Sequence, residues 1–121
     1  MKDPQIYTDG YQLALSLFHR TKSFGKHLRP TLGRKLEETA IDLVLTTKKA
    51  MFSKGDFKVK HLHKTSEILD EIRILIQLSR DLEMLTVGGY SEICLPTKEL
   101  GKEIGGLLRH EDATKSARKS V

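Results

Sequence analysis

Two runs of basic side chains carry the chemistry that this sequence offers most clearly, which is the binding of phosphate groups. Residues 19–35 contain six lysines and arginines and no acid, and residues 48–64 contain six lysines against Asp56 alone. Between Glu67 and Glu103 the balance reverses to eight acids and four bases. This pattern predicts a surface that faces a polyanion, backed by an acidic one. The alternative is that the lysines only keep a small protein soluble.

Ten cations are the candidate nucleic-acid-binding residues, on the grounds of charge and position alone. Arg73 and Arg80 are one heptad apart, so they share a helix face. Pairing with neighbouring acids such as Asp70 or Asp81 is the competing role for them. The ten candidates are Arg20, Lys22, Lys26, Arg29, Arg34, Lys35, Lys48, Lys49, Arg73 and Arg80.

The other reactive side chains do not form a catalytic or metal-binding pattern. No histidine has a glutamate three residues before it, which is the inward-facing pair of metal-binding helical bundles. His61 and His63 are two residues apart and would point to different sides of a helix. Cys94 has no evident base partner and is expected to be a small core residue. The sequence therefore predicts no metal, no cofactor and no enzymatic activity.

A ribonuclease is the alternative of a different class. Arg20 and His27 have the spacing R-x6-H, which occurs in helical ribonucleases of the HEPN type, where the pair serves a site at a dimer interface. Here the pair straddles Gly25, and Thr21 stands where Asn or Asp usually follows the arginine. A purely structural oligomer is a further alternative, and it predicts no salt-sensitive binding of RNA.

Four amphipathic stretches with short breaks between them must position these residues, and they favour an all-α antiparallel up-down-up-down bundle. Pro96 lies inside the fourth stretch, so we expect a kink there or a late helix start. Residues 1–110 are expected to form the bundle, and residues 111–121 a disordered basic tail. The expected helices span about 8–24, with a start as early as 4, then 30–52, 57–85 and 89–109.

Length and composition place the chain among small, charged, globular proteins. It has 121 residues, a net charge of +5 and one cysteine, which cannot form an internal disulfide. No apolar run approaches the roughly 18 residues needed to cross a membrane. The first residues lack the apolar stretch of a signal peptide. These features predict a cytoplasmic protein without a membrane partner.

Two stretches resemble a known family. Residues 9–44 read DGYQLALSLFHRTKSFGKHLRPTLGRKLEETAIDLV, and the later stretch contains LDEIRILIQLSRDLEML and KELGKEIGGLLR. In order and spacing they resemble the four-helix-bundle proteins related to the 23S rRNA intervening-sequence protein. Among these, the similarity is greatest to the accessory (Avd) proteins of diversity-generating retroelements. The resemblance covers roughly residues 8–109; Gly25 and Pro30, both in the first loop, depart from the family pattern.

The resemblance implies a homopentameric, non-enzymatic accessory protein. Such a protein would bind a reverse transcriptase and its template RNA, or an RNA/DNA hybrid, and support mutagenic cDNA synthesis. An intervening-sequence-type protein of undefined role is the alternative within the same fold. Independently of the family, apolar residues outside the core stripes suggest a second buried face, as an oligomer needs: Ile41, Leu45, Ile74 and Leu78.

Overall fold

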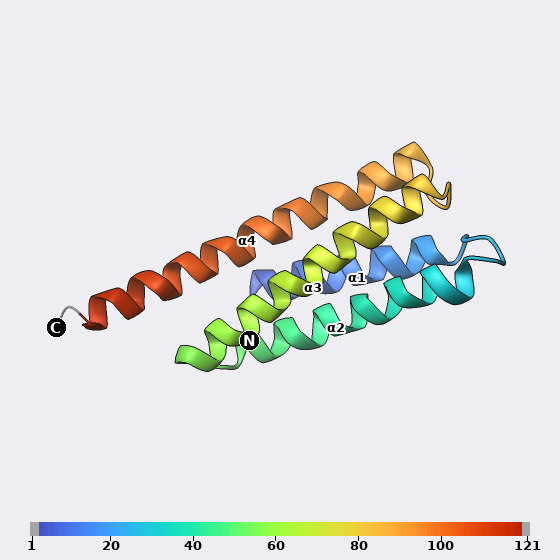
Figure 1. Ribbon diagram of the computed structural model, residues 1–121. Coiled ribbons are helices and arrows are strands. Elements are labelled where there is room, and N and C mark those ends of the chain that lie inside the picture. Colours follow the sequence, from blue (N-terminus) through green and yellow to red (C-terminus); the bar gives the residue numbers. More distant parts are fainter. Residues whose placement is uncertain (1–2, 120–121) are drawn as a thin grey trace.

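The computed structural model describes residues 3–119, and the regular secondary structure in this range is entirely helical. A short π-helical segment, η1, leads directly into the second long helix. The four long helices confirm the predicted all-α class and agree with a four-helix bundle (Figure 1). In chain order the elements are α1 (Gln5–Thr21), η1 (Arg29–Gly33), α2 (Arg34–Met51), α3 (Gly55–Asp81) and α4 (Val87–Lys119).

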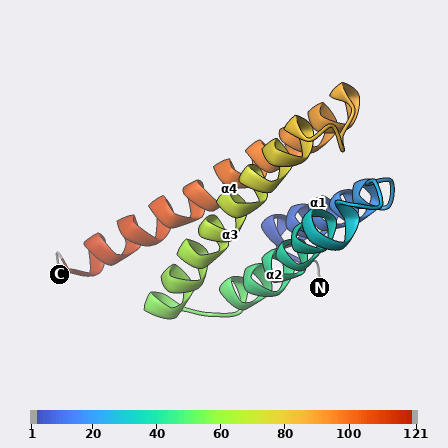
Figure 2. The same cartoon turned by 45° about the vertical axis from the view of Figure 1, so that its right-hand side comes forward.

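Each long helix packs against the one before it, and α4 also packs against α1. Figures 1 and 2 show the α1–α2 and α3–α4 connections at one end of the molecule and the α2–α3 turn at the other. Side-chain contacts agree with this arrangement. Lys48, late in α2, lies over the ring of Tyr7, early in α1. Arg20, late in α1, pairs with Glu92, early in α4. Each end of the bundle is therefore built from segments that are far apart in the sequence.

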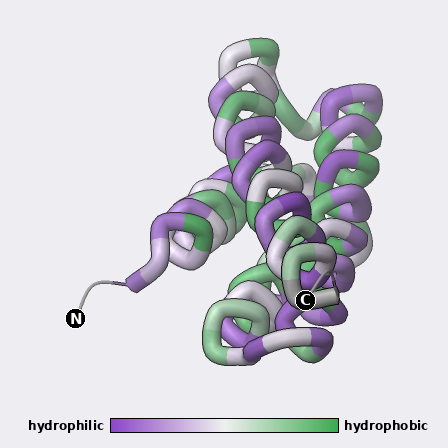
Figure 3. Tube along the Cα trace, turned by 90° about the vertical axis from the view of Figure 1, so that its left-hand side faces the viewer, coloured by the Kyte–Doolittle hydropathy of each residue, from purple (hydrophilic) through white to green (hydrophobic). Residues whose placement is uncertain are grey.

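A single apolar core fills the space between the four helices. Figure 3 shows hydrophobic and hydrophilic residues alternating along each helix, as an amphipathic stripe requires. Burial of these stripes removes apolar surface from water and is the main stabilising contribution to such a bundle. The bulkiest apolar side chains with almost no exposed surface are Leu13, Leu17, Leu36, Leu43, Leu62, Leu69, Ile72, Ile93, Leu100 and Ile104.

Buried hydroxyl groups are satisfied mostly within their own helices. Five of them donate a hydrogen bond of 2.6–2.7 Å to the carbonyl four residues earlier: Thr39, Thr47, Thr65, Ser79 and Thr97. Thr21 also reaches across to α2, where its hydroxyl lies 2.5 Å from Oε2 of Glu37. No buried side-chain polar atom lacks a partner among the described residues. The core therefore depends on apolar packing, with the Thr21–Glu37 bond as a polar link between α1 and α2.

Helix α4 differs most from its prediction. It begins at Val87 and passes through Pro96, so the proline does not delay its start. Proline lacks an N–H group and costs one helical hydrogen bond, but burial of Ile93 and Leu100 on either side holds the helix in place.

The C-terminal part of α4 corrects the predicted disordered tail, because residues 111–119 are helical; residues 120–121 lie outside the described range. Two ion pairs join this part to the start of α3. Oε1 of Glu111 lies 3.5 Å from Nζ of Lys58, and Nζ of Lys115 lies 3.6 Å from Oδ1 of Asp56. Partners so distant in the sequence leave no local periodicity, which is why the pattern of residues 111–121 did not indicate a helix.

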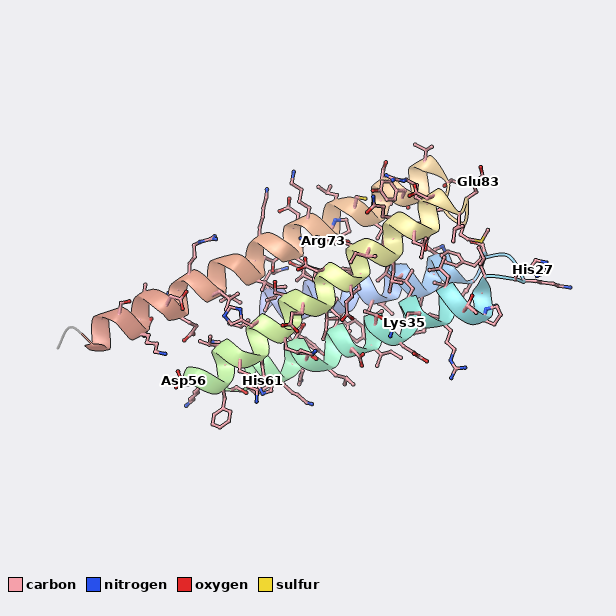
Figure 4. The ribbon with its side chains drawn as sticks, viewed as in Figure 1. His27, Lys35, Asp56, His61, Arg73 and Glu83 are labelled. Atoms are coloured by element: carbon pink, nitrogen blue, oxygen red, sulfur yellow. The ribbon has the colours of Figure 1, made fainter. Side chains whose placement is uncertain are left out.

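Glu83 gives a first test of the fold, because it has a φ of 62° directly after α3 (Figure 4). The following Met84 N–H bonds the Ser79 carbonyl at 2.8 Å, the usual closure of a helix end where glycine is preferred. We expect Glu83→Gly to raise the free energy of unfolding by about 0.5–1 kcal/mol in urea denaturation, since it removes a Cβ clash. Glu71→Gly, inside α3, should lower it by about 1 kcal/mol. Destabilisation by Glu83→Gly would contradict the assigned strain.

Glu103 on α4 is a partly buried carboxyl that shares a hydrogen bond with Asp9 on α1. Burial, followed by the hydrogen bond and charge of Asp9 and the charge of Glu99, raises the pKa of Glu103 to about 7. The ordinary pKa of a glutamate is 4.5, so the folded chain holds this proton more tightly than the unfolded chain. The resulting stabilisation is complete below about pH 4.5 and is lost as the pH rises through about 7.

Asp9→Asn should therefore reduce the pH dependence of stability. At pH 8 the variant should be more stable than the wild type, because one of two neighbouring negative charges is gone. The gain should stay below about 1 kcal/mol, since the two carboxyls are only partly buried and water still screens their repulsion. Urea denaturation at pH 5 and pH 8 measures this difference, with Asp42→Asn on α2 as a control acid. Equal pH profiles for the wild type and Asp9→Asn would refute the shared proton.

Candidate nucleic-acid interface

Four of the ten predicted cations, all arginines, are held by acids. Three of these pairs are local, with N–O distances between 2.6 and 3.0 Å. The fourth joins the end of α1 to the start of α4. Their charges are compensated within the chain, so they are the weaker candidates for phosphate contact. The pairs are Arg34–Glu38, Arg73–Asp70, Arg80–Asp81 and Arg20–Glu92.

Two of these arginines also pack against glycines of α4. A Cβ atom built on Gly101 would overlap with the guanidinium of Arg73, which Figure 4 shows between α3 and α4. A Cβ on Gly89 would lie 3.2 Å from Nη1 of Arg20. The glycines leave room for long side chains to cross α4, so these arginines contribute to helix packing as well as to ion pairs.

Arg80 belongs to a small polar cluster with Tyr90 and Cys94. Its guanidinium lies 4.8 Å from the ring centroid of Tyr90 and donates to the phenol oxygen at 3.1 Å. A hydrogen bond with Cys94, and then desolvation, raise the pKa of Tyr90. Tyr90 and Cys94 also line a groove of about 350 Å³ between α3 and α4. The contacts join the last turns of α3 to the first turns of α4.

The other six predicted cations are exposed and make no ion pair within residues 3–119. They lie mainly at the two ends of the bundle. One group sits in the α1–α2 connection, where Figure 4 shows His27 pointing away from the helices. The other group, Lys48 and Lys49, lies in the last turn of α2. Lys35 belongs to neither group and lies early in α2. These six cations are Lys22, Lys26, Arg29, Lys35, Lys48 and Lys49.

A groove of about 590 Å³ lies between α2 and α3 near their turn, and we name it the basic groove. Lys64 pairs with Glu67 at 3.4 Å, whereas Lys49 and Lys60 make no ion pair in the described range. Figure 4 shows His61 at this end, near the start of α3. The residues lining the basic groove are Thr46, Lys49, Lys60, His61, His63, Lys64 and Glu67.

Several residues of this region were missing from the predicted site. Lys60, His61 and His63 line the basic groove, and Lys54 is exposed in the turn beside it. The positive charge of the whole run 48–64 could have indicated these residues. The predicted site contained only Lys48 and Lys49 from this run. The groove shows why the run matters, because it places cations of two helices on either side of one depression.

The ribonuclease pair is not assembled within this chain. The side chain of Arg20 is directed to Glu92 on α4. His27 is exposed in the connection after α1, and no contact joins it to Arg20 in the described structure. The Gly25 break therefore separates the two side chains that a helical R-x6-H motif would place together.

Further comparisons give no identity for the chain. Among the described residues, no group of three or more His, Cys, Asp and Glu side chains could hold a metal ion. None of the described helices combines the length and apolar character needed to span a membrane. No protein-family model matches the sequence, and no curated protein matches it. The family resemblance therefore stays a prediction drawn from the sequence.

Proposed function

We propose that this protein is a non-enzymatic RNA-binding accessory protein that works as a homo-oligomer. The observation that carries the proposal is the basic groove, where Lys49 and Lys60 face one depression whose single acid, Glu67, pairs with Lys64. His61 and His63 line the same depression and add hydrogen-bonding groups. Phosphate oxygens are suitable partners for such a cluster, because their binding releases counterions and compensates the lysine charges.

The distribution of compensated charge supports the same proposal. Along α3 and α4, acids neutralise arginines in the pairs of Arg73 and Arg80. Most of the predicted cations without acidic partners lie instead in the α1–α2 connection and late in α2, although Lys98 and Arg109 on α4 also make no ion pair among the described residues. A phosphate chain would be attracted to these two ends and repelled by the acidic surface between Glu67 and Glu103. In an oligomer the same ends would be repeated, and the contacts to one RNA would multiply.

The finer identity rests on the family resemblance. We infer an antiparallel up-down-up-down bundle that assembles as a homopentamer, like the accessory Avd proteins of diversity-generating retroelements. Its partners would be a reverse transcriptase and template RNA, or an RNA/DNA hybrid, in mutagenic cDNA synthesis. An intervening-sequence-type protein would have the same fold without dependence on a polymerase.

Apolar surface supports the self-association part of the proposal. A groove of about 210 Å³ between α1 and α2 is lined by Tyr11, Ala14, Leu15, Phe18, Ile41, Val44 and Leu45. A separate patch on α3 contains Ile74, which is 64% exposed, and Leu78, which is 45% exposed. Two different patches on one chain permit head-to-tail contacts, which close into a ring when the rotation between subunits allows it.

The RNA-binding proposal predicts a salt-dependent affinity that the lysines of the basic groove control. In fluorescence anisotropy with a labelled structured RNA, binding should weaken steeply as salt rises. Lys49→Gln/Lys60→Gln should weaken binding and reduce the slope of log affinity against log salt by about 1.4–2, for two lost phosphate contacts. The matched control Arg73→Gln/Arg80→Gln should change the slope far less, because these charges are already paired.

Two results would contradict this proposal. No RNA binding by the wild type at low salt would leave the lysines with a solubilising role only. Cleavage of the RNA that His27→Ala abolishes would favour the ribonuclease instead. Intact RNA with a steep salt dependence supports the accessory function and justifies addition of the polymerase.

The oligomer proposal predicts that a charge in the α1–α2 groove disrupts assembly. Wild-type protein should appear in light scattering as one species several times the chain mass of 13.7 kDa. Leu45→Glu should shift it toward the mass of one chain, since the carboxylate would have to be buried at the interface. Leu95→Glu, at a 63% exposed position on α4, is the matched control. A wild-type mass of a single chain would rule out the pentamer.

A further inference from the structure

Two phenylalanines flank the turn between α2 and α3 and contribute little to the core. Phe52 follows the last residue of α2, Phe57 lies in the first turn of α3, and each exposes 71% of its surface. Gly55, with a φ of 61°, allows the sharp reversal that places both rings on one turn. Two large aromatic side chains exposed to water on either side of one turn indicate a contact site.

The surroundings of the two rings are cationic. Lys48 lies with its ammonium nitrogen 4.9 Å from the ring centroid of Phe52 and 4.9 Å from that of Tyr7. Lys49 and Lys54 are exposed nearby and make no ion pair among the described residues. Lys49, which lines the basic groove, directly follows Lys48, which contacts the ring of Phe52.

We propose that the turn Phe52–Phe57 is a stacking platform for unpaired RNA bases. The flat faces of bases stack on exposed aromatic rings, while neighbouring lysines contact the phosphates on either side. Each stacked base typically raises affinity about 5- to 150-fold. The proposal rests on the RNA-binding function above and narrows its ligand to single-stranded or loop regions, whose bases are accessible.

The polar composition of the turn argues against insertion of the two rings into a lipid bilayer. Asp56 directly precedes Phe57, and its side chain is 89% exposed. Insertion would bring this carboxylate and the ammonium group of Lys54 toward the hydrocarbon, at a high desolvation cost. Stacking of bases on the rings leaves both charged groups in water, so it uses the aromatic surface without that cost.

Tryptophan substitution gives a direct test, because the chain contains no tryptophan. Phe52→Trp and Phe57→Trp should each bind a single-stranded oligouridylate, and stacking should quench their fluorescence. A fully paired RNA duplex of equal length should quench them much less. Leu95→Trp, at a 63% exposed position on the α4 surface, is the matched control and should not be quenched. Bound oligouridylate without quenching of either Phe variant would overturn the proposal.

Removal of the rings should separate stacking from phosphate contact. Phe52→Leu/Phe57→Leu should lower the affinity for the single strand at least about fivefold and leave the salt slope unchanged. Lys49→Gln/Lys60→Gln should instead reduce that slope. Unchanged affinity in the Phe variant would overturn the platform and leave RNA binding intact, whereas no RNA binding by the wild type would remove both.

A membrane role is the competing outcome and has its own measurement. Wild-type protein and the Phe52→Leu/Phe57→Leu variant are sedimented with phosphatidylglycerol vesicles. The stacking proposal predicts that the wild type and the variant sediment with the vesicles to the same extent. Sedimentation that the double substitution abolishes, together with unchanged RNA affinity, would assign the rings to a lipid surface and overturn the proposal.

Discussion

The four helices share one core, and the burial of one apolar stripe from each helix fixes which side of every helix faces water. Buried hydroxyls bond mostly within their own helices, so apolar packing decides this orientation. The position of the charged residues follows from it. Ala50 and Leu62 are fully buried in the core. Lys49 and His63, which lie next to them in each helix, therefore point away from the core and line the groove between α2 and α3. The basic groove is thus a consequence of the same stripes that hold the bundle together.

The sequence correctly predicted the helices with strong apolar periodicity. The prediction was wrong where contacts between residues far apart in the sequence determine the structure. Helices α1, α2 and α3 lie close to their expected ranges, because their stripes recur at helical spacing. Pro96 and residues 111–119 gave local signals against a helix. Burial beside Pro96 and ion pairs to the start of α3 outweigh those signals in the structure. Neither effect can be read from a window of neighbouring residues.

The candidate site was predictable to a similar extent. The sequence already indicated that Arg73 and Arg80 could pair with neighbouring acids such as Asp70 and Asp81, and these pairs are present. The partner of Arg20 lies 72 residues away, so only the packing of α1 on α4 reveals it. The groove itself needed the register of α2 against α3. Charge along the chain located the basic region but did not define its shape.

The distribution of charge over the bundle would also orient an anionic ligand. Most of the predicted cations without acidic partners lie at the two ends, whereas the α3–α4 surface combines the paired arginines Arg73 and Arg80 with exposed acids such as Glu71 and Glu99. A phosphate chain that entered the basic groove would be kept off this surface by repulsion. The aromatic turn lies beside the groove, on the path that remains favourable for the chain. The charges would then determine where the RNA lies, and the exposed aromatic rings would favour its unpaired segments. Lysines would thus supply most of the affinity, and the two phenylalanines the selectivity for unpaired bases.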